Sequence, residues 1–129
     1  MPPIEQLQRP NGHEIEKLGR QGIFTTGLLL EVSETPTRRI TLADQVGVTT
    51  NDVNAWRDEA LLLNLASFGP AEQLLFAQAG IVGLVDLLAL DLDAFEARLD
   101  RAAAMLEVEP PTPLMVEGWW EQAQTLAET

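Results

Sequence analysis

Two stretches of this 129-residue chain repeat one another, and the repeat restricts the fold more than any other feature. The segment Leu18–Ile23 ends in Gly-Ile, and Phe76–Ile81 ends in the same way 58 residues later. Self-similarity at a fixed spacing indicates a repeated supersecondary unit that buries its apolar face against a neighbour. We therefore predict two related units, residues 1–60 and 61–129. The motifs that support this division further along the chain are Val53-x-x-Trp56-x-x-x-Ala60 and Val116-x-x-Trp119-x-x-x-Ala123.

The apolar pattern of both units is helical. Leu92, Phe95, Leu99 and Ala103 recur at three- and four-residue intervals, which is the stripe of an amphipathic helix. The nearest candidate for a strand, residues 23–26, is too short to form a sheet. The sequence therefore predicts an all-α fold with four or five short helices in each unit.

Glycines and capping residues mark where these helices end and begin. A left-handed residue closes many helices, and glycine adopts that conformation without a steric cost. A side-chain oxygen that accepts a backbone N–H favours a helix start, so we predict Thr49 or Thr50 as one N-cap. Asp91 or Asp93 is predicted as another. The glycines predicted to end helices are Gly22, Gly47 and Gly80.

The chain is strongly acidic, and its charge is uneven. It carries 20 acidic and 8 basic residues, a net charge of −12. Residues 1–60 hold 9 acids and 6 bases (−3), and residues 61–129 hold 11 acids and 2 bases (−9). Nucleic-acid binding draws most of its affinity from neutralised phosphates, so this balance opposes it. Any contact with a polyanion is expected on the first unit.

No constellation of catalytic residues emerges, so we do not expect an enzyme. The chain has no cysteine, which excludes disulfides and thiolate metal sites. His13 is the single histidine and lies in a polar turn. Asp91-x-Asp93 resembles the start of a calcium loop, but Glu96 stands where that loop needs a glycine. We therefore expect no metal and no cofactor.

The expected location is the cytoplasm. The first residues lack the basic and apolar regions of a signal peptide. Apolar runs such as Leu61–Leu63 are far too short to span a bilayer, so no membrane contact is expected.

The stretch from Leu65 to Ile81 resembles a helix-hairpin-helix motif. The hairpin is Ser67-Phe68-Gly69, and the helix after it runs to the stop Ala79-Gly80-Ile81. Over residues 4–126 the chain resembles a bacterial family of tandem helical repeats, known only as a domain of unknown function of helix-hairpin-helix type. The resemblance implies two tandem helix-hairpin-helix-like units packed into one small domain, and it implies no activity. The matching residues are Gly22-Ile23-x-Thr25-Thr26-x-x-Leu29-Leu30, Thr35-Pro36-x-x-Arg39, Leu42-Ala43-x-x-x-Gly47-Val48, Trp56-x-x-x-Ala60-x-Leu62, Leu74-Leu75, Ala79-Gly80-Ile81, Leu87-Leu88 and Trp119.

DNA-binding hairpins usually grip a phosphate with the amides of Gly-x-Gly, next to a basic residue. The second hairpin here lacks the first of those glycines and contains no basic residue. The first hairpin, Arg9–His13, contains Pro10, which removes one donor amide. We favour turns that pack two helices and keep nucleic-acid binding through the first hairpin as the alternative. Its candidate contacts are Arg9, Asn11, Gly12, Arg20, Arg38 and Arg39.

Residues Leu42–Trp56 also resemble a helix-turn-helix, with small and apolar residues at its packing positions. The segment that would read DNA, residues 50–59, carries three acids against the single Arg57. Acids oppose a groove lined by phosphates. A helical corner within the unit is therefore the preferred interpretation.

The double tryptophan Trp119-Trp120 leaves two interpretations open. Adjacent helical residues point about 100° apart, and the repeat places Trp119 in the core. Trp120 then lies at the edge of that face, either exposed as an anchor for a protein partner or covered by the C-terminal segment. Together with the acidic second unit, this leads us to expect a non-catalytic protein-interaction or scaffold module whose protein partner tolerates negative charge.

Overall fold

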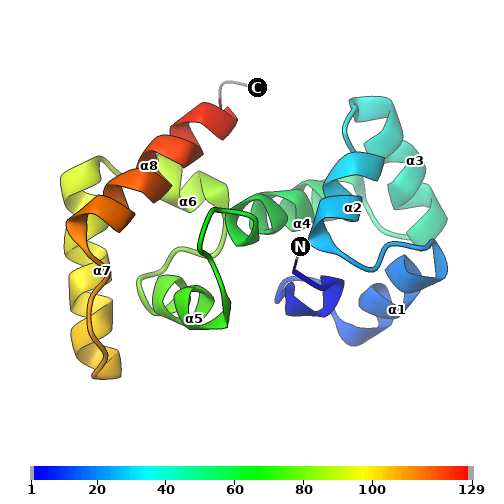
Figure 1. Cartoon of the computed structure of the whole chain (residues 1–129). Coiled ribbons are helices and arrows are strands. Elements are labelled where there is room, and N and C mark those ends of the chain that lie inside the picture. Colours follow the sequence, from blue (N-terminus) through cyan, green and yellow to red (C-terminus); the bar gives the residue numbers. More distant parts are fainter. Residues whose placement is uncertain (1, 128–129) are drawn as a thin grey trace. The chain divides into compact units, whose positions relative to one another are not determined.

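The computed structural model describes residues 2–127, and every regular element among them is a helix, so the all-α prediction is confirmed. The chain divides into two compact units, Met1–Asn64 and Leu65–Thr129 (Figure 1). Their interpretation as helix-hairpin-helix repeats stays a prediction. Unit 1 holds the 3-10 helix η1 (Ile4–Gln6) and the helices α1 (Gly12–Arg20), α2 (Thr26–Val32), α3 (Pro36–Val46) and α4 (Thr50–Leu63). Unit 2 holds α5 (Pro70–Gln78), α6 (Leu84–Leu88), α7 (Leu92–Leu106) and α8 (Pro113–Ala127).

The helix boundaries follow the predicted punctuation. Gly22, Gly47 and Gly80 have φ angles of +80°, +70° and +78° in the turns after α1, α3 and α5. These three positions are left-handed as predicted. Of the alternative N-caps, Thr49 caps α4 and Asp91 caps α7, each with a side-chain oxygen that accepts a backbone N–H.

The core of unit 1 lies where α4 packs against α2 and α3. Val53, Trp56 and Ala60 are buried, and their spacing places them on one face of α4. Leu29 from α2 and Leu42 from α3 are buried with them. Trp56 is therefore part of the core of unit 1, and the equivalent Trp119 is buried in unit 2 as predicted.

The residues before α1 belong to the same core. Ile4 and Leu7 are buried, and the Ile4 N–H donates to the Phe24 carbonyl over 2.9 Å. The Thr26 N–H donates to the Pro2 carbonyl over 3.0 Å. The start of the N-terminal segment, which comprises residues 2–10 (dark blue in Figure 1), is thus fixed against the turn between α1 and α2.

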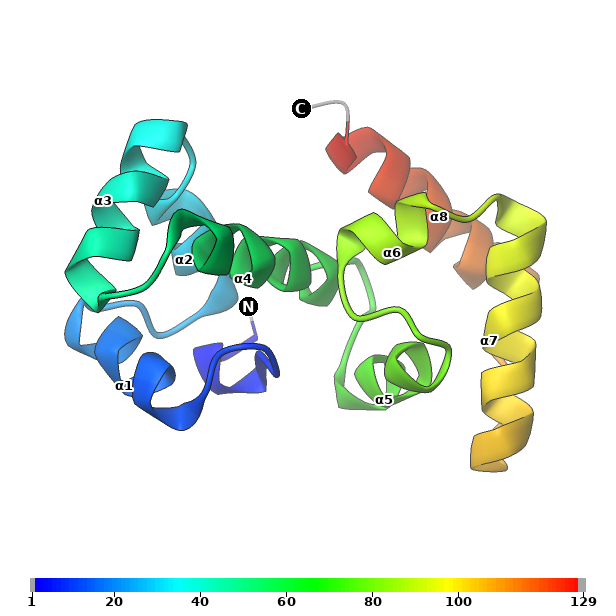
Figure 2. The same cartoon turned by 180° about the vertical axis from the view of Figure 1, so that it is seen from behind.

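Unit 2 packs α8 against α6 and α7, and α5 against α7 (Figure 2). Its core is aromatic, and Phe76 lies at the centre. The centroid of that ring is 4.8 Å from Phe68, 5.6 Å from Phe95 and 5.2 Å from Trp119, in edge-on arrangements. Edge-to-face pairs at these distances stabilise a core beyond the burial of their area.

Equivalent turns occur in the two units. Helix α5 begins and ends 58 residues after α1. The Ile23 N–H donates to the Leu18 carbonyl over 3.0 Å, and the Ile81 N–H donates to the Phe76 carbonyl over 2.8 Å. Glu107 ends α7 with a φ of +57°, a conformation that glycine holds after α3. The turns after α1 and α5, which the 58-residue offset pairs, therefore share a left-handed glycine and the same backbone hydrogen bond.

Candidate interaction site

A carboxylate from α4 closes the first hairpin. Glu59 is 3% exposed, and its two oxygens accept the N–H groups of Gln8 and Arg9 over 2.7 and 3.1 Å. Hydrogen bonds to a carboxylate are among the stronger ones, and burial keeps water from competing. Glu59 therefore occupies amides to which a bound phosphate would hydrogen-bond.

The next amide of this hairpin belongs to the start of α1. The Asn11 side chain accepts the Glu14 N–H over 2.8 Å, and the Glu14 carboxylate accepts the Asn11 N–H over 2.9 Å. This reciprocal pair is a capping box. Gly12 is the first residue of the helix and is exposed. A second carboxylate of the unit itself thus accepts the Asn11 amide, which is one of the predicted phosphate contacts.

Arg9 and Arg20 each contact an acid of their own unit. The Arg9 guanidinium donates to the Ala55 carbonyl over 2.7 Å and pairs with Asp58 at 3.0 Å. Arg20 pairs with Glu16 one turn away on α1, at 2.5 Å. The Arg20 pair is exposed and contributes little stability. Arg20 is therefore the more easily recruited of the two cations.

Arg38 and Arg39 lie away from the hairpin. The first turn of α3 and the loop before α1 are at opposite ends of unit 1 in both views (Figures 1 and 2). Arg38 makes only long contacts, 3.4 Å to the Glu31 carbonyl and 3.8 Å to the Glu34 carboxylate. Arg39 donates to the Ser33 carbonyl over 2.9 Å. The six candidate phosphate contacts therefore lie in three separate places: the hairpin, the exposed side of α1 and the start of α3.

Arg57, the one cation of α4, turns toward the end of α2. It donates to the Leu30 carbonyl over 2.9 Å and to the Ser33 hydroxyl over 2.6 Å. Burial lowers the pKa of Arg57, and the neighbouring Arg39 lowers it further, whereas Glu34 raises it. Cations at a helix C-terminus satisfy its last carbonyl groups. Arg57 and Arg39 therefore hold the end of α2 in place.

The acids of α4 serve unit 1 itself. Asp52 and Thr49 form a capping box at its start, Asp58 pairs with Arg9, and Glu59 closes the hairpin. These contacts are those of a helical corner. They give no support to the helix-turn-helix alternative, in which the same helix would face DNA.

Helix α8 holds the second hairpin through two side chains. Gln122 accepts the Ala66 N–H over 2.9 Å, and the Trp119 indole N–H donates to the Ala66 carbonyl over 2.8 Å. The Glu72 carboxylate accepts the Gly69 N–H over 2.8 Å. In this hairpin too, the protein's own side chains occupy backbone amides.

An apolar groove of about 330 Å³ lies between this hairpin and the first half of α8. Leu114 and Met115 line it and are 80% and 41% exposed, whereas Trp119 is buried beneath. Ser67, whose φ is +58°, also lines the groove. The other lining residues are Ala66, Thr112, Gly118 and Gln122. Leu114 is the most exposed large apolar side chain in the part of the chain that the structure describes. Exposed apolar surface beside a hollow is typical of an interaction site.

Trp120 is half-buried and does not line this groove. Its indole N–H donates to the Leu90 carbonyl over 3.3 Å, which ties α8 to the loop after α6. The contact favours a packing role for Trp120, with the Leu90 carbonyl as one neighbour. The use of Trp120 as an anchor for a partner stays a prediction.

Within residues 2–127, no group of three or more His, Cys, Asp or Glu side chains is placed to hold a metal ion. None of the described helices is long and apolar enough to cross a membrane.

Both hairpins were predicted from the sequence, but the side chains that accept their backbone N–H groups were not. Asn11-x-x-Glu14 and Gly69-x-x-Glu72 have the spacing of a capping box, which was the available signal. Glu59 and Gln122 lie at the same 63-residue offset as the two core tryptophans. The groove beside Leu114 had no sequence signal, because it depends on where the hairpin meets α8.

Comparison with known proteins identifies a family and no activity. No curated protein and no solved structure matches the chain. DUF4332, a domain of unknown function, matches residues 11–126, from the N-cap of α1 to the last turn of α8. Because this match spans most of the chain, the protein belongs to the DUF4332 family.

Proposed function

We propose that this protein is a non-catalytic protein-interaction or scaffold module, built of two tandem helix-hairpin-helix-like units and acting in the cytoplasm. The groove of unit 2 carries the proposal, because Leu114 and Met115 are exposed there above the buried Trp119. A partner side chain that enters the groove removes apolar surface from water. Each Å² of such burial contributes about 25 cal/mol.

The charge of unit 2 defines the partner. Helix α8 carries Glu117 and Glu121 and no basic residue, and residues 61–129 have a net charge of −9 (11 acids, 2 bases). A second copy of this acidic chain would be repelled, whereas a basic partner is attracted. An amphipathic helix with lysines or arginines beside its apolar face matches both the groove and the charge.

Nucleic-acid binding through the first hairpin is the alternative, and the geometry supports it less. Glu59 and Glu14 occupy hairpin amides, and Arg9 is paired with Asp58. A phosphate would have to displace these carboxylates before it could contact the same groups. Arg20 is the cation that such a ligand could recruit at least cost, because its pair with Glu16 is exposed.

Titration of the full chain with a labelled basic amphipathic peptide tests the proposal. In this peptide leucines form the apolar face of a helix and lysines form the polar face. Its fluorescence anisotropy should rise as the protein is added. The anisotropy of a control peptide, in which glutamates replace the lysines, should stay unchanged. Leu114→Gln should weaken binding by about tenfold or more, because one buried leucine contributes about 1.5–3 kcal/mol. Since Leu114 is 80% exposed, this variant keeps the fold.

The matched control is Met105→Gln on α7, a residue that is 72% exposed and does not line the groove. It should leave the affinity unchanged. An equal loss with both variants, or no binding of the basic peptide, would contradict the proposal. Micromolar binding of duplex, single-stranded or branched DNA or of RNA, weakened by salt and by Arg20→Ala, would favour the alternative.

A further inference from the structure

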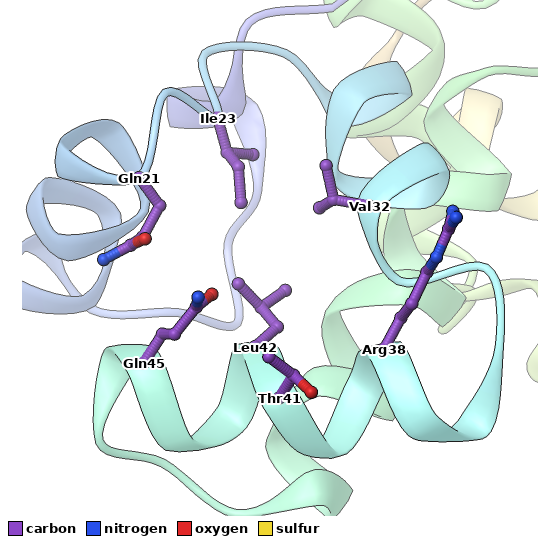
Figure 3. A pocket seen from close by; sticks show the side chains of 7 residues that line it. All are labelled: Gln21, Ile23, Val32, Arg38, Thr41, Leu42 and Gln45. Atoms are coloured by element: carbon purple, nitrogen blue, oxygen red, sulfur yellow. The ribbon is translucent and has the colours of Figure 1, made fainter.

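Unit 1 contains a pocket of about 400 Å³ at the end of α1, the end of α2 and the face of α3. Ile23, Val32 and Leu42 point toward one another across it (Figure 3). Ile23 and Leu42 are buried parts of the core, whereas Val32 is 39% exposed. The pocket thus has an apolar interior and a size that small ligands occupy in other proteins.

Polar side chains form the rim of this pocket. The Gln45 carboxamide reaches toward the pocket from α3, beside Leu42, and Arg38 extends along the side next to Val32 (Figure 3). Gln21 and Thr41 complete the lining. The seven lining residues include one cation and no acid, in a chain whose net charge is −12.

Arg38 determines the charge of a ligand that fits here. Its side chain is 58% exposed, and its nearest carboxylate, Glu34, is 3.8 Å away. An exposed pair at that distance contributes little stability. A carboxylate that binds both guanidinium N–H groups makes a stronger, bidentate contact. Arg38 can therefore exchange its present neighbour for a ligand without disturbing the core.

We propose that this pocket binds a small apolar carboxylate. Its aliphatic part would lie on Val32, above the buried Ile23 and Leu42, and its carboxylate on Arg38. A free N-acylated leucine has this chemistry, and so has the C-terminal residue of a peptide that ends in leucine. The site lies in unit 1 and does not depend on the docking groove proposed for unit 2.

Heteronuclear NMR of the labelled full chain, titrated with N-acetyl-L-leucine, tests the site. The backbone signals of Ile23, Val32 and Leu42 should shift and saturate at millimolar concentrations. Acetate, which lacks the side chain, should leave them unchanged, and N-acetyl-L-leucinamide, which lacks the charge, should bind about tenfold more weakly. Arg38→Gln should cause a similar loss.

The matched control is Arg101→Gln, which makes the same change of charge on α7 of unit 2. It should bind N-acetyl-L-leucine as the parent chain does. Absence of saturable shifts at these residues, or equal losses with Arg38→Gln and Arg101→Gln, would overturn the inference. A pentapeptide with a free C-terminal leucine that binds more tightly than N-acetyl-L-leucine identifies a chain terminus as the source. Equal affinity identifies the small acid as sufficient, and both results support the site.

Discussion

At the scale of residues, the two hairpins are held by related side chains with different chemistry. Glu59 accepts two backbone N–H groups, Gln8 and Arg9, whereas Gln122 accepts the single N–H of Ala66. A carboxylate has two acceptor oxygens and a carboxamide has one. The first hairpin therefore needs an acid where an amide suffices in the second.

Replacement of Glu59 should show this difference in chemical denaturation. Glu59→Gln keeps one acceptor and should lower the free energy of unfolding by about 1 kcal/mol. Glu59→Leu leaves both part-buried donors without the carboxylate and should cost about 2–4 kcal/mol. The exposed Glu16→Gln should stay within about 0.5 kcal/mol of the parent chain. A Leu variant as stable as the Gln variant would show that the hairpin does not depend on these bonds.

At the scale of elements, the N-terminal segment is part of unit 1 although the family match begins only at residue 11. Ile4 and Leu7 are buried, and the amides of Gln8 and Arg9 are the partners of Glu59. The segment thus supplies two core side chains and donates two backbone hydrogen bonds to the buried Glu59 carboxylate. The folded unit therefore begins before the matched region.

Deletion of residues 1–10 should unfold unit 1. Loss of two buried aliphatic side chains costs about 1.5–3 kcal/mol each, and the orphaned carboxylate adds about 1–3 kcal/mol. Together these losses approach the free energy of unfolding of a typical domain, which is about 5–15 kcal/mol. Circular dichroism during urea denaturation measures the loss, with the exposed Glu5→Gln as the control. A truncated chain with the parent's urea midpoint would refute the role given to this segment.

The elements also show which features a sequence can predict. Gly22, Gly47 and Gly80 could be placed because a left-handed turn strongly favours one residue type. Ser67 and Glu107 adopt the same conformation without that signal, so neither residue could be predicted as left-handed, although the hairpin at Ser67 was predicted. The tertiary partners of Glu59 and Trp120 were equally hidden, because they lie 50 or 51 and 30 residues away along the chain. Local chemistry was predictable and distant pairing was not.

At the scale of the whole molecule, net charge determines which partners the chain attracts or repels. The net charge is −12 at pH 7, and the sequence pI is about 4.2. Copies of the chain repel one another at neutral pH, and this repulsion vanishes as carboxylates gain protons. The same field attracts basic partners and slows the approach of nucleic acids.

Acidification should therefore make the protein associate. Light scattering should stay low at pH 7 and rise as the pH falls toward about 4.2, because a net charge near zero promotes association. Added salt at pH 7 serves as the control for screening alone. Scattering that stays low through the pI would show that charge is not what keeps the chains apart.

Glu59 at the first hairpin can also be regarded as a ligand tethered to its own receptor. A tethered group competes at an effective concentration that is millimolar even for a short flexible link, and Glu59 is held on a helix and buried. A free anion must exceed that concentration to share the amides of Gln8 and Arg9. Lysines introduced around the hairpin would speed the association of a phosphate, but they would not displace Glu59 from these two amides.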